Sequence, residues 1–175
     1  EILNAEIITI SWHDLSCGWV DPIETSIVKA VLDNNTIITV AAGNTAAENQ
    51  YTTYCSLFSG IFPDRANFGP FSKSIDDRII VVSGTNRFDN YNNSAFYECK
   101  STDICAPAEM ITNLYQNNGN PSLMVSTGTS FAAPITAGVI SLLKCINPCL
   151  TSVQAKEIIQ QTADPITNGA QWLDF

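Results

Sequence analysis

The chain has 175 residues, of which 45% are hydrophobic and 14% are charged, and its formal net charge is −9. This length can bury the core of one domain, and the apolar fraction excludes an intrinsically disordered protein. An acidic chain with 8 lysines and arginines disfavours nucleic acid as a partner, and no uninterrupted apolar stretch is long enough to predict a membrane span.

Three nearly uninterrupted apolar runs, rich in β-branched residues, predict strands at residues 6–11, 36–42 and 78–84. Strands of this kind are buried on both faces, which is typical of a parallel sheet. Between the first two runs, a helix is predicted by a capping Asp21, by Pro22 at the first helical position, and by an acidic residue three after the cap. Strand, helix and strand together predict a right-handed crossover.

Longer irregular segments follow. Residues 45–77 are expected to form a surface excursion, and residues 86–125 a turn-rich region with a short strand at 122–126. A final helix is predicted to begin at Thr151, where Gln154 completes a capping box, and the following Asp-Pro-Ile-Thr-Asn-Gly run ends it. Its inward face is expected to hold Ala155, Ile158, Ile159 and Thr162.

Before that helix, a longer one is predicted to begin near Ser130. Gly128 permits a tight turn there, and Pro134 is tolerated within a first helical turn. Five residues of little bulk should let this helix pack closely against its neighbours. They are Ala132, Ala133, Ala137, Gly138 and Ser141.

The chain has six cysteines and one histidine. The cysteines are Cys17, Cys55, Cys99, Cys105, Cys145 and Cys149. Because they form no CxxC pair, a zinc site is disfavoured, and we expect no metal and no cofactor. Their even number favours disulfides and a secreted or extracytoplasmic protein, with Cys99–Cys105 and Cys145–Cys149 as local bridges. Six reduced, buried thiols are the alternative.

Two polar residues stand at positions where chemistry is possible. Ser130 lies at a helix start, where unpaired amides and the helix dipole favour developing negative charge. Asn44 follows the run at 36–42, and an amide at the carboxyl end of a strand can donate to an oxyanion. Each residue also has an ordinary interpretation: Ser130 as a helix cap, and Asn44 as a turn residue.

The order of five segments resembles the subtilisin-like serine proteases, the subtilases of the peptidase S8 family. The segments are ITIS (8–11), VAAGN (40–44), RIIVVSG (78–84), DICAPA (103–108) and GTSFAAPITAG (128–138). The resemblance is to about the carboxyl-terminal two-thirds of the catalytic domain and covers nearly all of the chain. It implies one domain over residues 1–175, with a three-layer α/β fold. A mainly parallel sheet would be flanked by helices and incomplete at its N-terminal side.

The resemblance also implies roles for particular residues. Ser130 would be the nucleophile of a serine endopeptidase acting on a peptide or protein substrate. The Asn44 side chain and the Ser130 amide would form the oxyanion hole. One edge of the substrate channel would be formed by Ser11, Trp12 and His13, and the other by Ala41, Ala42 and Gly43.

The family's catalytic aspartate and histidine precede the segments that this chain contains. The single histidine, His13, falls on the substrate-binding edge instead. We therefore expect the chain to be inactive alone and its partner to be a segment carrying Asp and His, either covalent or as a companion chain. Without that segment an exposed sheet edge would favour homo-oligomers or strand exchange. The alternatives are a non-catalytic subtilase-like module that binds peptides or serves as a scaffold, and a hydrolase that uses His13 as its base.

Overall fold

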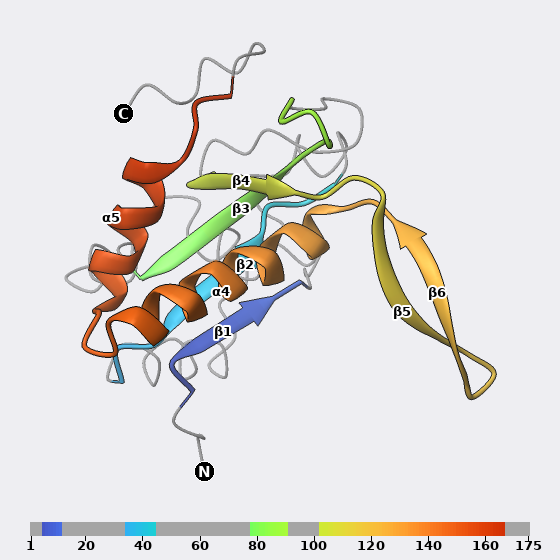
Figure 1. Cartoon of the computed structure of the whole chain (residues 1–175), viewed down its shortest axis with the longest axis horizontal. Coiled ribbons are helices and arrows are strands. Elements are labelled where there is room, and N and C mark those ends of the chain that lie inside the picture. Colours follow the sequence, from blue (N-terminus) through green and yellow to red (C-terminus); the bar gives the residue numbers. More distant parts are fainter. Residues whose placement is uncertain (1–4, 12–33, 45–77, 91–101, 167–175) are drawn as a thin grey trace, which may run out of the picture.

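The computed structural model describes residues 5–11, 34–44, 78–90 and 102–166. Four parallel strands form one sheet in the spatial order β1-β2-β3-β4 (Figure 1). They are β1 (Ile7–Ile10), β2 (Ile37–Ala41), β3 (Ile79–Thr85) and β4 (Ile104–Pro107). The three predicted strands and the parallel sheet are thereby confirmed. The helix predicted after Asp21 and the excursion at 45–77 lie outside the described residues.

The two central strands are buried on both of their faces. Residues that alternate along β2 and β3 point to opposite sides, and both sets are buried. One set packs into the core beneath the helices and includes Ile37, Ile80 and Val82, while the other set is Ile38, Val40, Ile79 and Val81. Double-sided burial explains why these strands read as continuous apolar runs rather than alternating ones.

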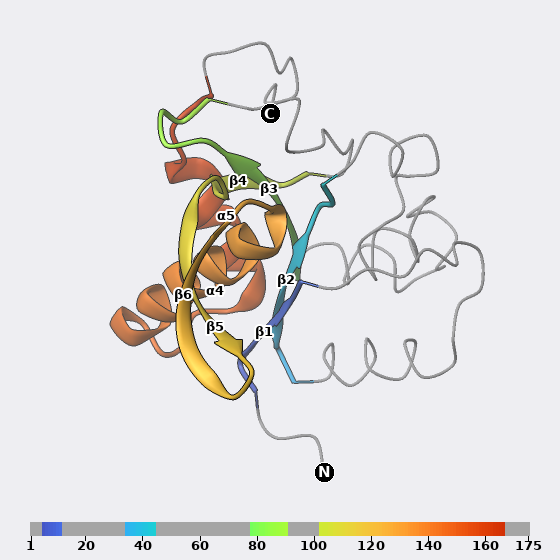
Figure 2. The same ribbon diagram turned by 90° about the vertical axis from the view of Figure 1, so that its right-hand side faces the viewer.

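Helices α4 (Thr129–Ile146) and α5 (Ser152–Thr162) cover the same face of the sheet (Figure 2). Helix α4 contacts all four strands, and its Ala132 and Ala133 are fully buried. Two expectations for α4 were wrong. Gly138 and Ser141 lie on the exposed side of the helix, so they do not contribute to close packing. Pro134 is its sixth residue and lies beyond the first turn.

By length and composition alone, α4 could cross a membrane, although its apolar run is interrupted by polar residues. Its mean hydropathy is 1.5, and a third of it is buried. The buried side packs on the sheet, whereas the opposite side exposes large apolar residues. These are Ile135, Val139, Leu142 and Ile146. The contacts with all four strands identify α4 as the helix that packs centrally on the described sheet.

The predicted capping box of α5 is confirmed. Thr151 caps the helix, and its side chain and that of Gln154 each accept from the other's backbone N–H. Ala155 and Ile159 are buried as predicted. Thr162 is exposed, contrary to the prediction, because its hydroxyl donates to the carbonyl of Ile158 in the last helical turn (2.7 Å) instead of packing inward.

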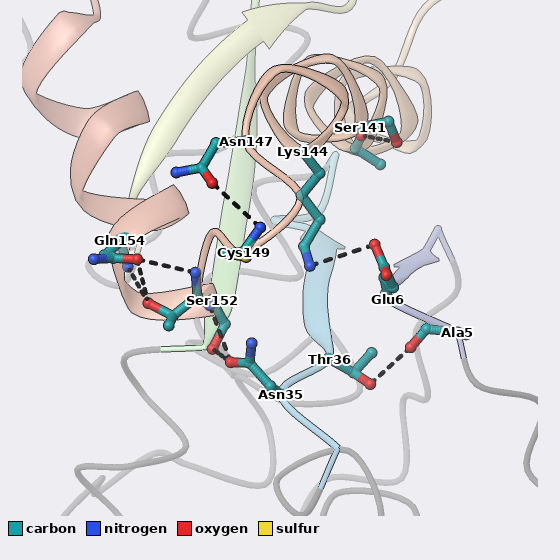
Figure 3. Close-up of polar contacts among 12 residues, drawn as sticks. Ala5, Glu6, Asn35, Thr36, Ser141, Lys144, Asn147, Cys149, Ser152 and Gln154 are labelled. Atoms are coloured by element: carbon teal, nitrogen blue, oxygen red, sulfur yellow. Dashed lines mark hydrogen bonds and ion pairs between the residues drawn. The ribbon is translucent and has the colours of Figure 1, made fainter.

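Polar contacts join the helix ends to the starts of β1 and β2 (Figure 3). The Asn35 side-chain oxygen accepts from both the N–H (3.1 Å) and the hydroxyl (2.9 Å) of Ser152 at the start of α5. Asn35 itself has a left-handed backbone (φ 53°), which asparagine tolerates better than most residues. The ammonium of Lys144, near the end of α4, lies 3.4 Å from the Glu6 carboxylate.

A second ion pair fastens α5 to the sheet. The ammonium of Lys156 lies 2.9 Å from Asp103 Oδ1, and both side chains are largely buried. Lys156 also donates to the carbonyl of Ile79 (2.8 Å), while Asp103 Oδ2 accepts from the N–H of Val81 (2.9 Å). Both charges thus have hydrogen-bond partners as well as each other, which burial requires.

A hairpin of β5 (Ile111–Asn117) and β6 (Asn120–Ser126) extends away from the sheet (Figure 1). The predicted strand at 122–126 is confirmed within β6, whereas β5 was not predicted. Asn118 (φ 48°) and Gly119 (φ 86°) form the turn, the dipeptide that two-residue hairpins favour.

The described cysteines do not form the predicted bridges. Cys105, Cys145 and Cys149 carry free thiols, so the predicted Cys145–Cys149 and Cys99–Cys105 pairs are wrong in this structure. Cys149 lies in a turn organised by Asn147, whose side-chain oxygen accepts from the Cys149 N–H (3.2 Å). Burial raises the pKa of the Cys105 thiol to about 11, which the hydrogen bond with Ser83 only partly opposes.

Candidate active site

The site lies where the carboxyl ends of β1 and β2 meet the start of α4. Ser11 directly follows β1, Asn44 lies three residues beyond β2, and Ser130 is the second residue of α4. The parallel sheet brings both strand ends to one edge, and α4 begins against that edge. Ser11, Gly43, Asn44 and Ser130 are therefore brought together, and their roles stay predictions. Trp12 and His13 lie outside the described residues.

Ser130 is joined to Ser11 by two reciprocal hydrogen bonds. The Ser130 hydroxyl donates to the carbonyl of Ser11 (3.2 Å), and the Ser11 hydroxyl donates to the carbonyl of Ser130 (2.7 Å). Ser130 is half-buried, so its hydroxyl remains within reach of a ligand. Its backbone N–H lies in the first turn of α4, where amides have no intrahelical acceptor.

The side-chain amide of Asn44 is held in one orientation. Its oxygen accepts from the backbone N–H of Thr129 (2.7 Å) and from the Thr129 hydroxyl (3.0 Å). Since both donors address the oxygen, the amide nitrogen is directed to the opposite side of the group. The nitrogen is the atom of this group that can act as a donor, so Thr129 fixes the direction in which Asn44 can donate.

Thr129 is the site residue that sequence reasoning missed. It is fully buried, and its hydroxyl accepts from the N–H of Gly43 (3.1 Å) while lying within reach of two acceptors. One hydroxyl therefore ties α4 to the segment after β2. The sequence did contain one indication of this role, because Thr129 stands between Gly128 and Ser130 at the start of a helix. A hydroxyl at that position can bond to a segment that comes earlier in the chain.

Gly128 permits the turn that delivers Thr129 and Ser130. Its backbone angles, φ 159° and ψ 152°, are essentially restricted to glycine. Its N–H donates to the carbonyl of Ala108 (2.9 Å), and a Cβ at this position would lie 3.4 Å from the Asn44 side-chain oxygen. The segment after β4 thus holds the start of α4 in place beside Asn44.

Ala41 and Ala42 are predicted to line one edge of the substrate channel, and both side chains are buried. Ala41 ends β2, and the N–H of Ala42 donates to the carbonyl of Val82 in β3 (2.9 Å). Gly43 has a positive φ of 108° and turns the chain toward Asn44. Contact with a peptide at this edge would therefore come from the backbone, and it stays a prediction.

Within the described ranges, the Ser130 hydroxyl donates to the carbonyl of Ser11, and the Ser130 carbonyl accepts from the Ser11 hydroxyl. No histidine lies in these ranges. The same residues contain no group of three or more His, Cys, Asp or Glu side chains that could hold a metal ion. The arrangement supplies a hydroxyl, a helix amide and an oriented side-chain amide. A base acting on Ser130 would have to come from outside these ranges.

Comparison with known sequences agrees with the segments singled out above. A sequence model of the subtilase family matches residues 3–173, nearly the whole chain. Subtilisin-like protease 1 of Plasmodium falciparum is 33% identical over 106 residues, which cover 58% of this chain and 14% of that protein. Mycosin-4 of Mycobacterium tuberculosis is 27% identical over 147 residues, covering 79% of this chain and 31% of that protein.

Solved structures agree on the fold. A protease of Pseudoalteromonas arctica superimposes with a TM-score of 0.68 at 20% identity, covering 93% of this chain and 45% of that one. A cold-adapted subtilisin-like serine proteinase gives 0.63 at 19% identity, covering 93% of this chain and 50% of that one. The chain thus spans at most about half of each of these relatives.

Proposed function

The chain belongs to the subtilase family of serine proteases, and from this premise we propose that it is the part of a serine endopeptidase that carries the nucleophile and the oxyanion hole. Ser130 is the nucleophile, and the Asn44 amide together with the Ser130 N–H stabilises the oxyanion. The observation that carries this proposal is the hold of Thr129 on Asn44, which directs the amide nitrogen away from Thr129.

The reaction follows from these positions. A base accepts the proton of Ser130 Oγ while the oxygen attacks the carbonyl carbon of a peptide bond. The carbonyl oxygen becomes negatively charged and accepts hydrogen bonds from Asn44 and from the helix amide. The intermediate then breaks its carbon–nitrogen bond, and the amine leaves with the proton. Water, deprotonated by the same base, attacks the remaining ester and restores Ser130.

The start of α4 is suited to the charged intermediate. The amides of the first turn and the helix dipole both favour negative charge at this end. The donors are in place before the reaction, so they need no reorganisation when charge develops. Removing one such donor generally costs about 3–4 kcal/mol of activation free energy.

We propose that the base and its orienting acid, a histidine and an aspartate, come from a further segment, either in the same polypeptide or in a companion chain. In the sheet as described, β1 is an edge strand that pairs with β2. A strand of that further segment would add beside β1 and bring its side chains toward Ser130. Without it, we expect copies of the chain to associate through this edge.

Peptide or protein substrates would lie between the chain after Ser11 and the backbone at Gly43, the two edges that the family resemblance implies. Secretion was expected from the even number of cysteines and stays a prediction. The free thiols of Cys105, Cys145 and Cys149 do not supply the disulfides on which it was based.

Asn44→Ala in the complete gene product tests the proposal. We expect casein hydrolysis to show a kcat about 100- to 1000-fold lower with little change in KM, because the lost donor acts on the transition state. Asn113→Ala is the matched control, since that amide donates to the carbonyl of Ile111 on the hairpin. Unchanged turnover in Asn44→Ala would contradict the assignment. A gene product that never hydrolyses casein would favour the non-catalytic peptide-binding or scaffold module.

A further inference from the structure

Pro134 interrupts the hydrogen bonds of α4 at one defined point. In an α-helix the N–H of each residue donates to the carbonyl four positions earlier. Proline has no N–H, so the carbonyl of Ser130 lacks its regular donor. The interruption therefore falls on the residue that carries the proposed nucleophile.

Ser11 supplies a replacement donor. Its hydroxyl donates to the Ser130 carbonyl at 2.7 Å, a typical length for a good O–H···O bond. In the other direction, the Ser130 hydroxyl donates to the Ser11 carbonyl at 3.2 Å. The end of β1 and the start of α4 are thus joined by a reciprocal pair of contacts between residues 119 positions apart.

Ser130 is consequently held from both sides. On its N-terminal side, the N–H and hydroxyl of Thr129 are bound to Asn44. On its C-terminal side, its carbonyl is bound by Ser11. With the residue before Ser130 and the peptide group after it both held, the direction in which Cβ leaves the backbone of Ser130 is restricted as well.

We propose that Ser11 is a positioning residue for the nucleophile, and that its hydroxyl takes the place of the helix N–H that Pro134 removes. The proposal rests on the proposed role of Ser130 and goes beyond it, because it gives Ser11 a function other than lining the substrate channel. Ser11 acts through Ser130 and need not touch the substrate.

Pro134 provides an internal test of this substitution of donors. Replacing it with alanine introduces an N–H at position 134 that can donate to the Ser130 carbonyl from within α4. Ser11→Ala should then cost much less in the Pro134→Ala background than in the parent. A residue that only lines the substrate channel would show the same cost in both backgrounds.

The kinetic experiment uses a small fluorophosphonate that inactivates the complete gene product, with kinact and KI measured separately. Ser11→Ala should lower kinact about three- to tenfold and leave KI unchanged, as expected for one lost neutral hydrogen bond. Ser11→Thr keeps the hydroxyl and should retain most of the parent rate. Ser141→Ala is the matched control, because that hydroxyl donates to the carbonyl of Ala137 on the same helix (2.9 Å).

Three results separate the possible failures. Equal losses for Ser11→Ala with and without Pro134→Ala, or a change confined to KI, would overturn the positioning role while leaving Ser130 as the nucleophile. A parent that does not react with the fluorophosphonate would instead refute the proposed function. In that case urea unfolding still tests the contact between Ser11 and Ser130. The proteins compared are the parent, Ser11→Ala, Pro134→Ala and the double variant. Additive losses of stability would show that the N–H at position 134 does not replace the Ser11 hydroxyl.

Discussion

Replacing Thr129 with valine isolates the contact that orients Asn44. Valine keeps the shape of the buried side chain but removes the hydroxyl, which accepts from Gly43 (3.1 Å) and lies 3.0 Å from the Asn44 oxygen. The backbone N–H of Thr129 still donates to Asn44 at 2.7 Å. The variant therefore loses the hydrogen bond from the hydroxyl to the Asn44 oxygen, keeps the one from the backbone N–H, and leaves the buried N–H of Gly43 without this acceptor.

The magnitudes follow from those two losses. An unsatisfied buried N–H costs about 1–3 kcal/mol, so we expect the free energy of unfolding to fall by that amount. Complete removal of an oxyanion donor costs about 3–4 kcal/mol of activation free energy, and a loosened donor should cost less. We expect about 1 kcal/mol, which corresponds to about fivefold slower inactivation of the complete gene product by a fluorophosphonate.

Thr136→Val is the matched control for this experiment. Thr136 is also buried on α4, but its hydroxyl donates to the carbonyl of Ala132 within the same helix (3.1 Å). Urea unfolding measures the stability of both variants. Inactivation kinetics should show that Thr136→Val leaves the inactivation rate unchanged. An inactivation rate unaffected by Thr129→Val would refute the claim that this hydroxyl orients Asn44.

Two further predictions concern the ion pairs and the thiols. Lys156→Met should lower the free energy of unfolding by about 3 kcal/mol, because the buried Asp103 carboxylate loses this ion pair. Glu6→Gln, at a carboxylate that is 68% exposed, should cost about 0–1 kcal/mol, and equal losses in urea unfolding would contradict this ranking. At pH 8 the raised pKa makes the Cys105 thiolate about 100-fold scarcer than for an ordinary thiol, so peptide mapping should find iodoacetamide labelling much slower than at exposed Cys145. The unfolded chain loses the Cys105 proton first, so this group lowers stability as pH rises from about 9 to about 11, and equally fast labelling at pH 8 would refute the burial argument.

The strands and helices that hold the site could be predicted from local patterns. Runs of β-branched residues at 36–42 and 78–84 predict strands because burial on both faces leaves no polar positions. Thr151 and Gln154 predict the start of α5 because the capping box is made by residues three apart. In each case the cause of the structure lies within a short stretch of sequence.

Contacts between distant segments could not be predicted in the same way. The hydroxyl of Thr129 meets Asn44 across 85 positions, and Ser11 meets Ser130 across 119. Pro134 indicates in part where such a contact is needed, since a proline inside a helix leaves the carbonyl four residues earlier without its helix donor. The sequence does not say which donor replaces it. The relation between Asn44 and Ser130 came from the family resemblance and not from spacing.

Two local signals were misread or missed. Spacing suggested a Cys145–Cys149 bridge, but both thiols are free and the intervening turn is organised by Asn147. The Asn118-Gly119 dipeptide favours a two-residue hairpin and could have revealed β5 as well as β6.

Mapping a covalent adduct tests the central claim most directly. The complete gene product is treated with a fluorophosphonate, and the modified residue is located by tandem mass spectrometry. Our account predicts a single phosphonyl group on Ser130, formed much more slowly in Asn44→Ala and absent in Ser130→Ala. A label on another residue, or labelling that persists in Ser130→Ala, would contradict the assignment of Ser130 as the nucleophile.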